Sequence, residues 1–198
     1  MAVLPPDQDP SAARAGAAAL ETPSPQQRFR VVAGLSLCLA VMYGVRADLS
    51  VGVRDMREEW PSEDWTGPAL SAFFVGYIAG NIPGSRLARR WGAREVLTGG
   101  VLGASAANAA IPFVAATPEM VVALRVFCGF AQGCLFPCTY ELLNEWTTPD
   151  TRSRAVAGCE CGVAAGTALG FVVSERMRLA YGLVGCFGVW SAAGVVWT

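Results

Sequence analysis

The chain has 198 residues, of which 53% are hydrophobic and only 16% are charged, and its mean hydropathy is +0.39. Soluble domains of ordinary composition have about 25% charged residues, so the shortage of charge indicates a protein that folds in lipid. The formal net charge of −1 gives no reason to expect a nucleic-acid partner. All basic residues are arginine and the chain has no histidine, which excludes Ser-His-Asp hydrolases, zinc hydrolases, Schiff-base enzymes and P-loop lysines.

The seven cysteines lie mostly within apolar stretches, and none forms a Cys-x-x-Cys pair. Cys134 and Cys138 are one helical turn apart and could in principle ligate a metal. Because no histidine is available to complete such a site, we interpret the cysteines as small apolar core residues. The sequence therefore predicts neither a metal site nor a cofactor.

Residues 1–29 are rich in proline, alanine, serine and glutamine and contain no apolar run, which predicts a disordered cytoplasmic tail. Residues 30–198 divide into apolar segments of about 20 residues each, the length at which an α-helix crosses a bilayer. Their connections are short, and several contain a proline. We therefore predict an all-α membrane protein with six transmembrane helices, at about 31–51, 67–88, 96–115, 120–143, 154–174 and 179–197.

The arginines outside the predicted spans are divided unevenly between the two sides of the membrane. From Arg28 onward, eight lie just before the first span or at the second-to-third and fourth-to-fifth connections, whereas four lie on the opposite side, where residues 55–64 are rich in acids. The positive-inside rule then predicts a cytoplasmic N-terminus. An even number of spans returns the C-terminus to the cytoplasm as well.

Charged residues interrupt several of the apolar spans, among them Arg46 and Asp48 in the first and Arg125 in the fourth. A charge at membrane depth is costly, so such residues usually face a cavity or a partner. The alternative is that these side chains reach to the membrane interface. Two arginines that face one cavity would favour an anion, because a guanidinium binds carboxylate or phosphate through two hydrogen bonds.

The fourth and fifth spans combine small residues with isolated polar ones. Gln132 lies two helical turns after Arg125 and on the same face, and Pro137 is expected to interrupt that helix. In the fifth span, glycines that recur every four residues predict a seam for close helix packing. Glu160 points away from this seam, so we expect it to face a water-filled cavity rather than lipid. The seam comprises Gly158, Gly162, Gly166 and Gly170.

The run from Arg46 to Val51, Arg-Ala-Asp-Leu-Ser-Val, resembles the first-span motif of the anion:cation symporter branch of the major facilitator superfamily. This branch includes vesicular glutamate carriers, sialin and phosphate carriers. Further matches follow in order, at residues 71–78, 82–84, 87–88 and 92, then from Arg125 to Phe136-Pro137 and Arg152-Ser153-Arg154, and on to 166–167. The resemblance therefore covers residues 30–198 and implies the N-terminal six-helix half of this fold.

By the same resemblance, the expected function is secondary transport of small organic or inorganic anions, such as phosphate or carboxylates, across a lipid bilayer. Arg46 and Arg125 match the two arginines that this branch uses around its anionic substrate. A cytoplasmic gate loop is implied at Gly84, Arg89, Arg90, Gly92 and Arg94.

Three residues depart from the family pattern. Gln132 stands where proton-driven members often have the glutamate that carries the proton, Arg89 where the gate loop usually has aspartate, and Asp48 where asparagine is usual. If the intact transporter is coupled to H⁺, the proton must use Glu160, Asp48 or a residue outside this chain. The alternative is transport driven by Na⁺ or by the membrane potential.

Members of this superfamily have two six-span halves, so we expect the chain to be a fragment whose partner is a C-terminal six-span half. Pairing of the six-span unit with a second copy is the alternative. The second functional hypothesis is a non-transporting six-helix remnant or partner-binding bundle. An enzyme is not expected, because the sequence shows no nucleophile–base pair and no metal-ligand set.

Overall fold

A computed structural model describes residues 24–61, 65–114 and 117–198 of the chain. Within these ranges the regular structure is entirely α-helical, so the predicted all-α class is confirmed. Most of the predicted tail, residues 1–23, lies outside the described residues. The helices are α2 (Pro25–Glu59), α3 (Thr66–Trp91), α4 (Ala93–Val114), α5 (Pro118–Gln132), α6 (Leu135–Trp146) and α7 (Pro149–Trp197).

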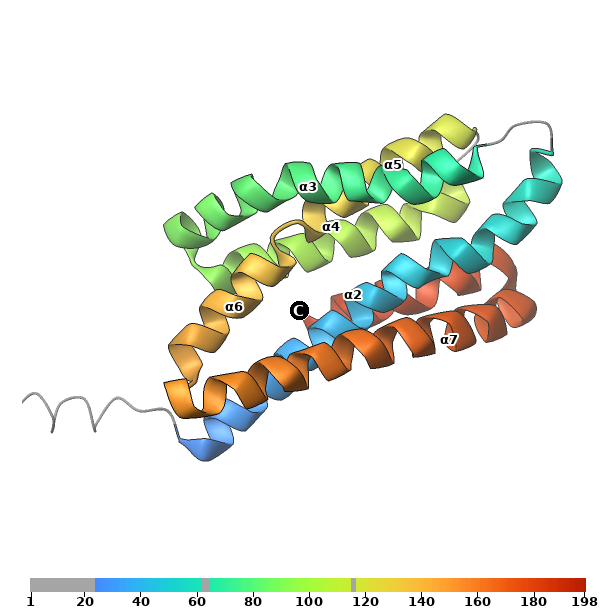
Figure 1. Ribbon diagram of the computed structural model, residues 1–198. Coiled ribbons are helices and arrows are strands. Elements are labelled where there is room, and N and C mark those ends of the chain that lie inside the picture. The colour runs from blue at the N-terminus through green and yellow to red at the C-terminus, as the bar shows by residue number, and fades with distance from the viewer. Residues whose placement is uncertain (1–23, 62–64, 115–116) are drawn as a thin grey trace, which may run out of the picture.

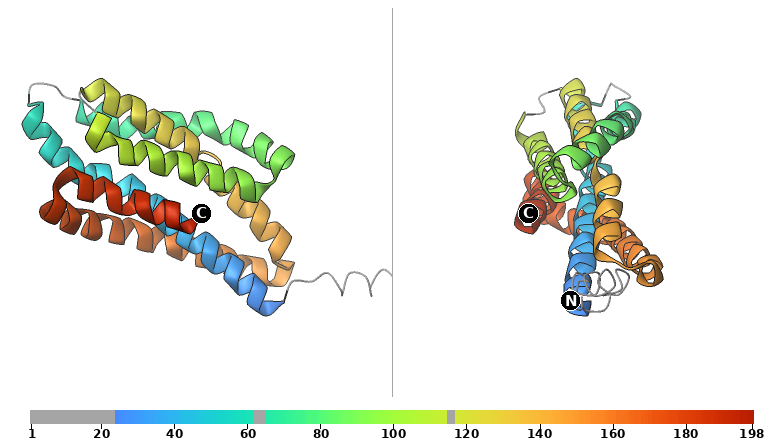
Figure 2. Two further views of the ribbon diagram at one scale, coloured as in Figure 1. Left: turned by 180° about the vertical axis from the view of Figure 1, so that it is seen from behind. Right: turned by 90° about the vertical axis from the view of Figure 1, so that its left-hand side faces the viewer.

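The helices form an elongated bundle of two groups that lie side by side (Figures 1 and 2). In one group α2 packs along α7, and in the other α3 and α4 pack against α5. Helix α6 continues from the second group toward the start of α7, and α4 also contacts α7. The direction of the chain alternates from α2 to α5, α6 continues in the direction of α5, and α7 turns back, so α2, α4 and α7 begin at the same end of the bundle.

Three helices begin with proline at their first position, where the missing N–H has no partner to lose. At α2, Ser24 and Gln27 form a capping box: the Ser24 Oγ accepts from the Gln27 amide (3.2 Å), and the Gln27 side-chain carbonyl accepts from the Ser24 amide (2.8 Å). This cap starts the helix at Pro25, earlier than the predicted span at 31. The helix also continues past the apolar stretch to Glu59.

The predicted span at 120–143 consists of two helices in the structure. Helix α5 ends at Gln132 and α6 begins at Leu135, with a turn at Gly133 and Cys134. Proline cannot donate to the carbonyl four residues earlier, and its ring clashes with that carbonyl. For Pro137 this carbonyl belongs to Gly133, which explains why the helix breaks there.

The connection between the predicted fifth and sixth spans lies later than the sequence indicated. Residues 175–178 were expected to be the loop, but they are helical, and the chain reverses at Gly182 with φ 64° and ψ −154°. Residues with a Cβ rarely adopt a positive φ of this kind, whereas glycine does so without strain. Glu175 and Arg178 form an i,i+3 ion pair (2.9 Å) that supports the helix through the predicted loop.

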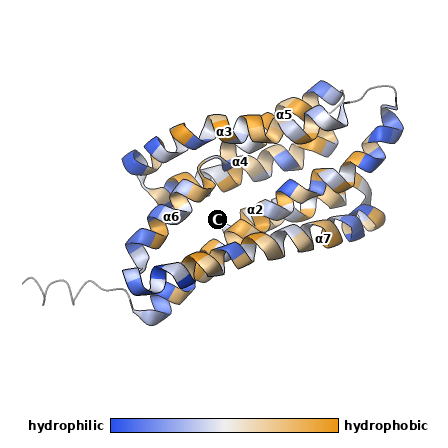
Figure 3. Cartoon of the chain, viewed as in Figure 1, coloured by the Kyte–Doolittle hydropathy of each residue, from blue (hydrophilic) through white to orange (hydrophobic). Residues whose placement is uncertain are grey.

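The outer surface of the bundle is apolar along most of its length, whereas polar residues gather at the two ends (Figure 3). On α3, Val75, Ile78 and Ile82 are 62%, 72% and 63% exposed, as expected of side chains that face lipid. Helices α2, α4 and α7, and α5 together with α6, are long and apolar enough to cross a membrane. Among the described residues α3 falls outside this set, because Gly, Ser, Asn and Pro lower its hydropathy.

Small residues allow α7 to approach α2 closely, and α3 to approach α5 closely. Glycine spacing predicted a close approach along the fifth span, which is part of α7. A Cβ at Gly166 of α7 would overlap the Ala40 carbonyl of α2, and one at Gly80 of α3 would overlap the Phe130 carbonyl of α5. The predicted seam on α7 therefore packs directly on the backbone of α2.

At the end of the bundle where α2 terminates, Arg178 joins α7 to α2. Its guanidinium donates to Asp55 Oδ1 (2.6 Å) and to both carboxylate oxygens of Glu175 (2.9 Å each). These hydrogen bonds lower the pKa of Glu175 below its ordinary value. The contact is solvent-accessible, so it contributes little to stability at high ionic strength.

Acidification is expected to weaken this contact. A carboxyl group whose pKa is lowered by folding stabilises the folded state above its unfolded pKa, and this stabilisation disappears as the pH falls through the folded value. We therefore expect the difference in Tm between the native chain and Arg178→Gln to shrink between about pH 6 and about pH 3. Thermal melts in detergent micelles measure it, with Arg176→Gln as the exposed control. A constant difference in Tm would contradict the assignment to Glu175.

Candidate anion site

Arg46 on α2 is half-buried and surrounded by aromatic rings. Its guanidinium carbon lies 4.2 Å from the ring centre of Tyr43, 4.8 Å from that of Phe73 and 5.0 Å from that of Tyr77. The Nε donates a hydrogen bond to Gln132 Oε1 (2.9 Å). The Nη2 is buried and has no hydrogen-bond partner among the described residues. Arg46 thus carries a positive charge with one donor group unused.

Arg125 on α5 has a different environment. Its Nη2 forms a 3.0 Å ion pair with Asp48 Oδ1, and its Nη1 donates to the Val45 carbonyl (3.2 Å). The side chains of Arg125 and Asp48 are only 2% and 0% exposed. The charge of Arg125 is therefore compensated by a carboxylate of the same chain, and neither residue reaches to the membrane interface.

Two further residues complete this buried ion pair. The Asn108 side-chain amide on α4 donates to Asp48 Oδ2 (2.6 Å) and to Ser191 Oγ on α7 (3.2 Å). Asp48 is thus held by α4 and α5 together. Asn108 and Ser191 were not predicted from the sequence. An isolated amide side chain in the apolar segment 101–114 could have indicated Asn108.

Aromatic side chains continue from Arg46 toward Glu160. Tyr43 meets Phe136 edge to face (6.4 Å between ring centres), and Phe136 stacks on Tyr140 (5.9 Å). Tyr140 in turn interacts electrostatically with the carboxylate of Glu160. Glu160 is exposed, on the side of α7 away from the buried glycine seam. The sequence placed Glu160 in this orientation but did not identify the aromatic residues between it and Arg46.

The predicted gate loop connects α3 to α4. Gly92 has φ 98°, a conformation that favours glycine and permits the abrupt turn between Trp91 and Ala93. A Cβ at Gly84 would lie 2.7 Å from the Cys134 Cβ, so this position packs against the break between α5 and α6. The three arginines of the loop are exposed at the end of the bundle; these are Arg89, Arg90 and Arg94.

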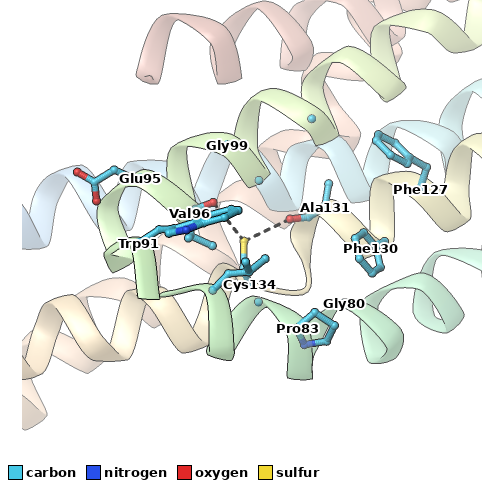
Figure 4. A pocket seen from close by; sticks show the side chains of 14 residues that line it. Gly80, Pro83, Trp91, Glu95, Val96, Gly99, Phe127, Phe130, Ala131 and Cys134 are labelled. Atoms are coloured by element: carbon cyan, nitrogen blue, oxygen red, sulfur yellow. Dashed lines mark hydrogen bonds between the residues drawn. The ribbon is translucent and has the colours of Figure 1, made fainter. Parts of the chain in front are cut away.

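A groove of about 340 Å³ lies between α3, α4 and α5, next to this loop (Figure 4). Phe127, Phe130 and Trp91 contribute large apolar surfaces, and Glu95 is the only acidic residue among the described residues that line it. The Cys134 thiol lies 3.4 Å from the Ala131 carbonyl and 3.6 Å from that of Val96. Arg46 and Arg125, the substrate residues implied by the resemblance, are not among the described residues that line this apolar groove.

The family profile described as "Major Facilitator Superfamily" matches residues 29–198. "Probable anion transporter 4, chloroplastic" of Arabidopsis thaliana is 30% identical over 174 residues, 86% of this chain and 32% of the relative. "Probable anion transporter 6" of Oryza sativa subsp. japonica is 29% identical over 172 residues (86% and 40%). "Vesicular glutamate transporter 2" of Mus musculus is 27% identical over 185 residues (84% and 31%). The chain thus spans between 31% and 40% of these relatives, and the expected resemblance is confirmed.

Proposed function

Because the chain belongs to the Major Facilitator Superfamily, we propose that it forms part of a secondary transporter of small anions, phosphate or carboxylates. The observation that carries this proposal is the buried Arg46 Nη2, which has no hydrogen-bond partner among the described residues. Buried polar groups are normally satisfied, and an oxygen of a bound carboxylate or phosphate would supply the missing acceptor. The names of the plant and vesicular relatives support an anion as the substrate.

In this proposal Arg46 contacts the anion directly. Arg125, the second substrate arginine implied by the resemblance, is engaged by Asp48 (3.0 Å), so we propose that it holds α5 against α2. The superfamily is one of transporters, which agrees with the expectation that the chain is not an enzyme.

Coupling to H⁺ would need a titratable group near the substrate. Gln132 cannot carry the coupled proton, because a carboxamide does not titrate. Its side-chain oxygen accepts a hydrogen bond from Arg46. The Asp48 carboxylate is bound by Arg125 and Asn108. Glu160 is exposed, and we propose it as the better candidate carrier; coupling to Na⁺ is the alternative.

We propose that the chain crosses the membrane six times, with its N-terminus in the cytoplasm. Helices α2, α3 and α4, the α5–α6 pair, and the two parts of α7 before and after Gly182 would supply the six crossings. The arginine-rich 86–94 segment lies at the end where α2 begins, which supports this orientation. A second six-span half would close the site over Arg46.

Arg46→Gln is expected to reduce anion uptake about tenfold or more, because a charge-assisted hydrogen bond contributes about 1.5–3 kcal/mol. The protein is expressed from its complete reading frame and reconstituted in proteoliposomes, and uptake of radiolabelled phosphate and glutamate is measured. Imposed H⁺ and Na⁺ gradients identify the coupling ion in the same assay.

The matched control is Arg54→Gln, on the same helix, because the Arg54 side chain is 73% exposed. It should leave uptake nearly unchanged. Equal uptake by Arg46→Gln and the native protein would refute the role of Arg46. If neither the native protein nor either variant took up an anion, the result would favour the non-transporting membrane bundle.

A further inference from the structure

A second pocket lies at the end of the bundle where α2 and α4 begin and where α6 and α7 end. Its volume is about 460 Å³, and each of these four helices contributes to its wall. Arg30 of α2 and Arg94 of α4 both line it. The pocket is therefore a cavity between helices at the membrane surface, separate from the residues around Arg46.

The pocket is positively charged. Both arginines are exposed, and neither forms an ion pair or a side-chain hydrogen bond with a residue that the structure describes. The described lining includes no aspartate or glutamate side chain. Two guanidinium groups from different helices are thus free to bind one anionic group, and the Thr98 hydroxyl on the same wall is a further donor.

Two tryptophans place the pocket at the depth of the lipid headgroups. Trp146 and Trp197 both line it and are half-buried. The Trp197 indole N–H donates to the Gly34 carbonyl (2.8 Å), which fixes the end of α7 against α2. Tryptophan is enriched at membrane–water interfaces. The rest of the wall includes the partly exposed side chains of Val31 and Leu142, so apolar surface adjoins the two charges.

We propose that this pocket binds the phosphate headgroup of one anionic phospholipid. The guanidinium groups of Arg30 and Arg94 would bind the phosphate oxygens, and Val31 and Leu142 would contact the first carbons of the acyl chains. Basic pockets between transmembrane helices bind anionic headgroups in this way. The adjoining apolar wall selects a lipid over free phosphate, which has no apolar part. The site does not include Arg46, the residue proposed to contact the transported anion.

Native mass spectrometry of the purified chain in detergent micelles tests the proposal. Thr198 lines the pocket. The affinity tag is therefore attached after Thr198, so that the terminal carboxylate lies away from the pocket. Phosphatidic acid is titrated against phosphatidylcholine with identical acyl chains. We expect preferential binding of one phosphatidic acid, and the Arg30→Gln/Arg94→Gln variant should lose about tenfold or more of that affinity.

The matched control is Arg89→Gln/Arg90→Gln, which removes the same charge from exposed residues that do not line the pocket. It should change the affinity by less than about twofold. Arg30→Lys/Arg94→Lys should retain more affinity than the glutamine variant, and thermal melts show that each variant is folded. Equal losses in the two glutamine variants, or equal binding of phosphatidylcholine, would overturn the proposal. Displacement of the lipid by equimolar inorganic phosphate would overturn the choice of a lipid.

Discussion

Asp48→Ala is expected to lower the free energy of unfolding by about 3–5 kcal/mol, because removal of one partner of a buried ion pair leaves the other charge uncompensated. Arg125 would keep its hydrogen bond to the Val45 carbonyl but lose the carboxylate at 3.0 Å. The Asn108 amide would lose its shortest hydrogen bond as well. Titration with a denaturing detergent, followed by tryptophan fluorescence, measures the change.

Asp55→Ala is the matched control, because the Asp55 carboxylate also binds an arginine but is 33% exposed. Its cost should stay below about 1 kcal/mol. The double variant Asp48→Leu/Arg125→Met removes both charges and should recover much of the loss. If Asp48→Ala cost no more than Asp55→Ala, the buried pair would not be a principal source of stability.

Gly166→Ala is expected to destabilise the protein by about 1–3 kcal/mol, because the added methyl group would overlap the Ala40 carbonyl and force α7 away from α2. Helix propensity acts in the opposite direction, since alanine in a helix interior is favoured over glycine by about 0.5–1 kcal/mol. The close contact is therefore expected to outweigh the propensity. The same detergent titration measures the difference.

Gly158→Ala lies on the same seam and provides the comparison. Its new Cβ would lie 3.4 Å from Val32 Cγ1, which is tight but not an overlap with backbone. Propensity should then dominate, and the variant should be as stable as the native chain or slightly more stable. A similar loss in both variants would show that helix approach at Gly166 does not limit stability.

Hydrophobic length and glycine spacing were sufficient to predict the all-α class and the glycine seam on α7, although not that α2 is the helix that packs on it. Helix ends were less predictable, because they depend on single residues. The capping box at Ser24 lengthened α2, and the reversal at Gly182 moved the connection between the last two predicted spans. The first feature depends on two local hydrogen bonds and the second on the backbone conformation of one residue, and hydropathy averaged over a span detects neither.

The candidate site was likewise predicted only in part. The charged residues Arg46, Asp48 and Arg125 were identified because charge is rare in apolar spans. Their pairing was not, since the sequence gives no distance between α2 and α5. We treated the two arginines as equivalent, whereas only Arg125 has a carboxylate partner. The aromatic rings around Arg46 were missed because aromatic residues are common throughout such spans.

The buried ion pair also bears on how the chain assembles during synthesis. An arginine at the centre of a transmembrane helix costs about 2.5–3.5 kcal/mol to insert on its own, and Arg125 lies in the middle of α5. Helices α2 and α4 precede α5 in the chain, so Asp48 and Asn108 have been synthesised before Arg125. The N-terminal helices can thus receive Arg125 as it enters the membrane, and Ser191 of α7 joins Asn108 last.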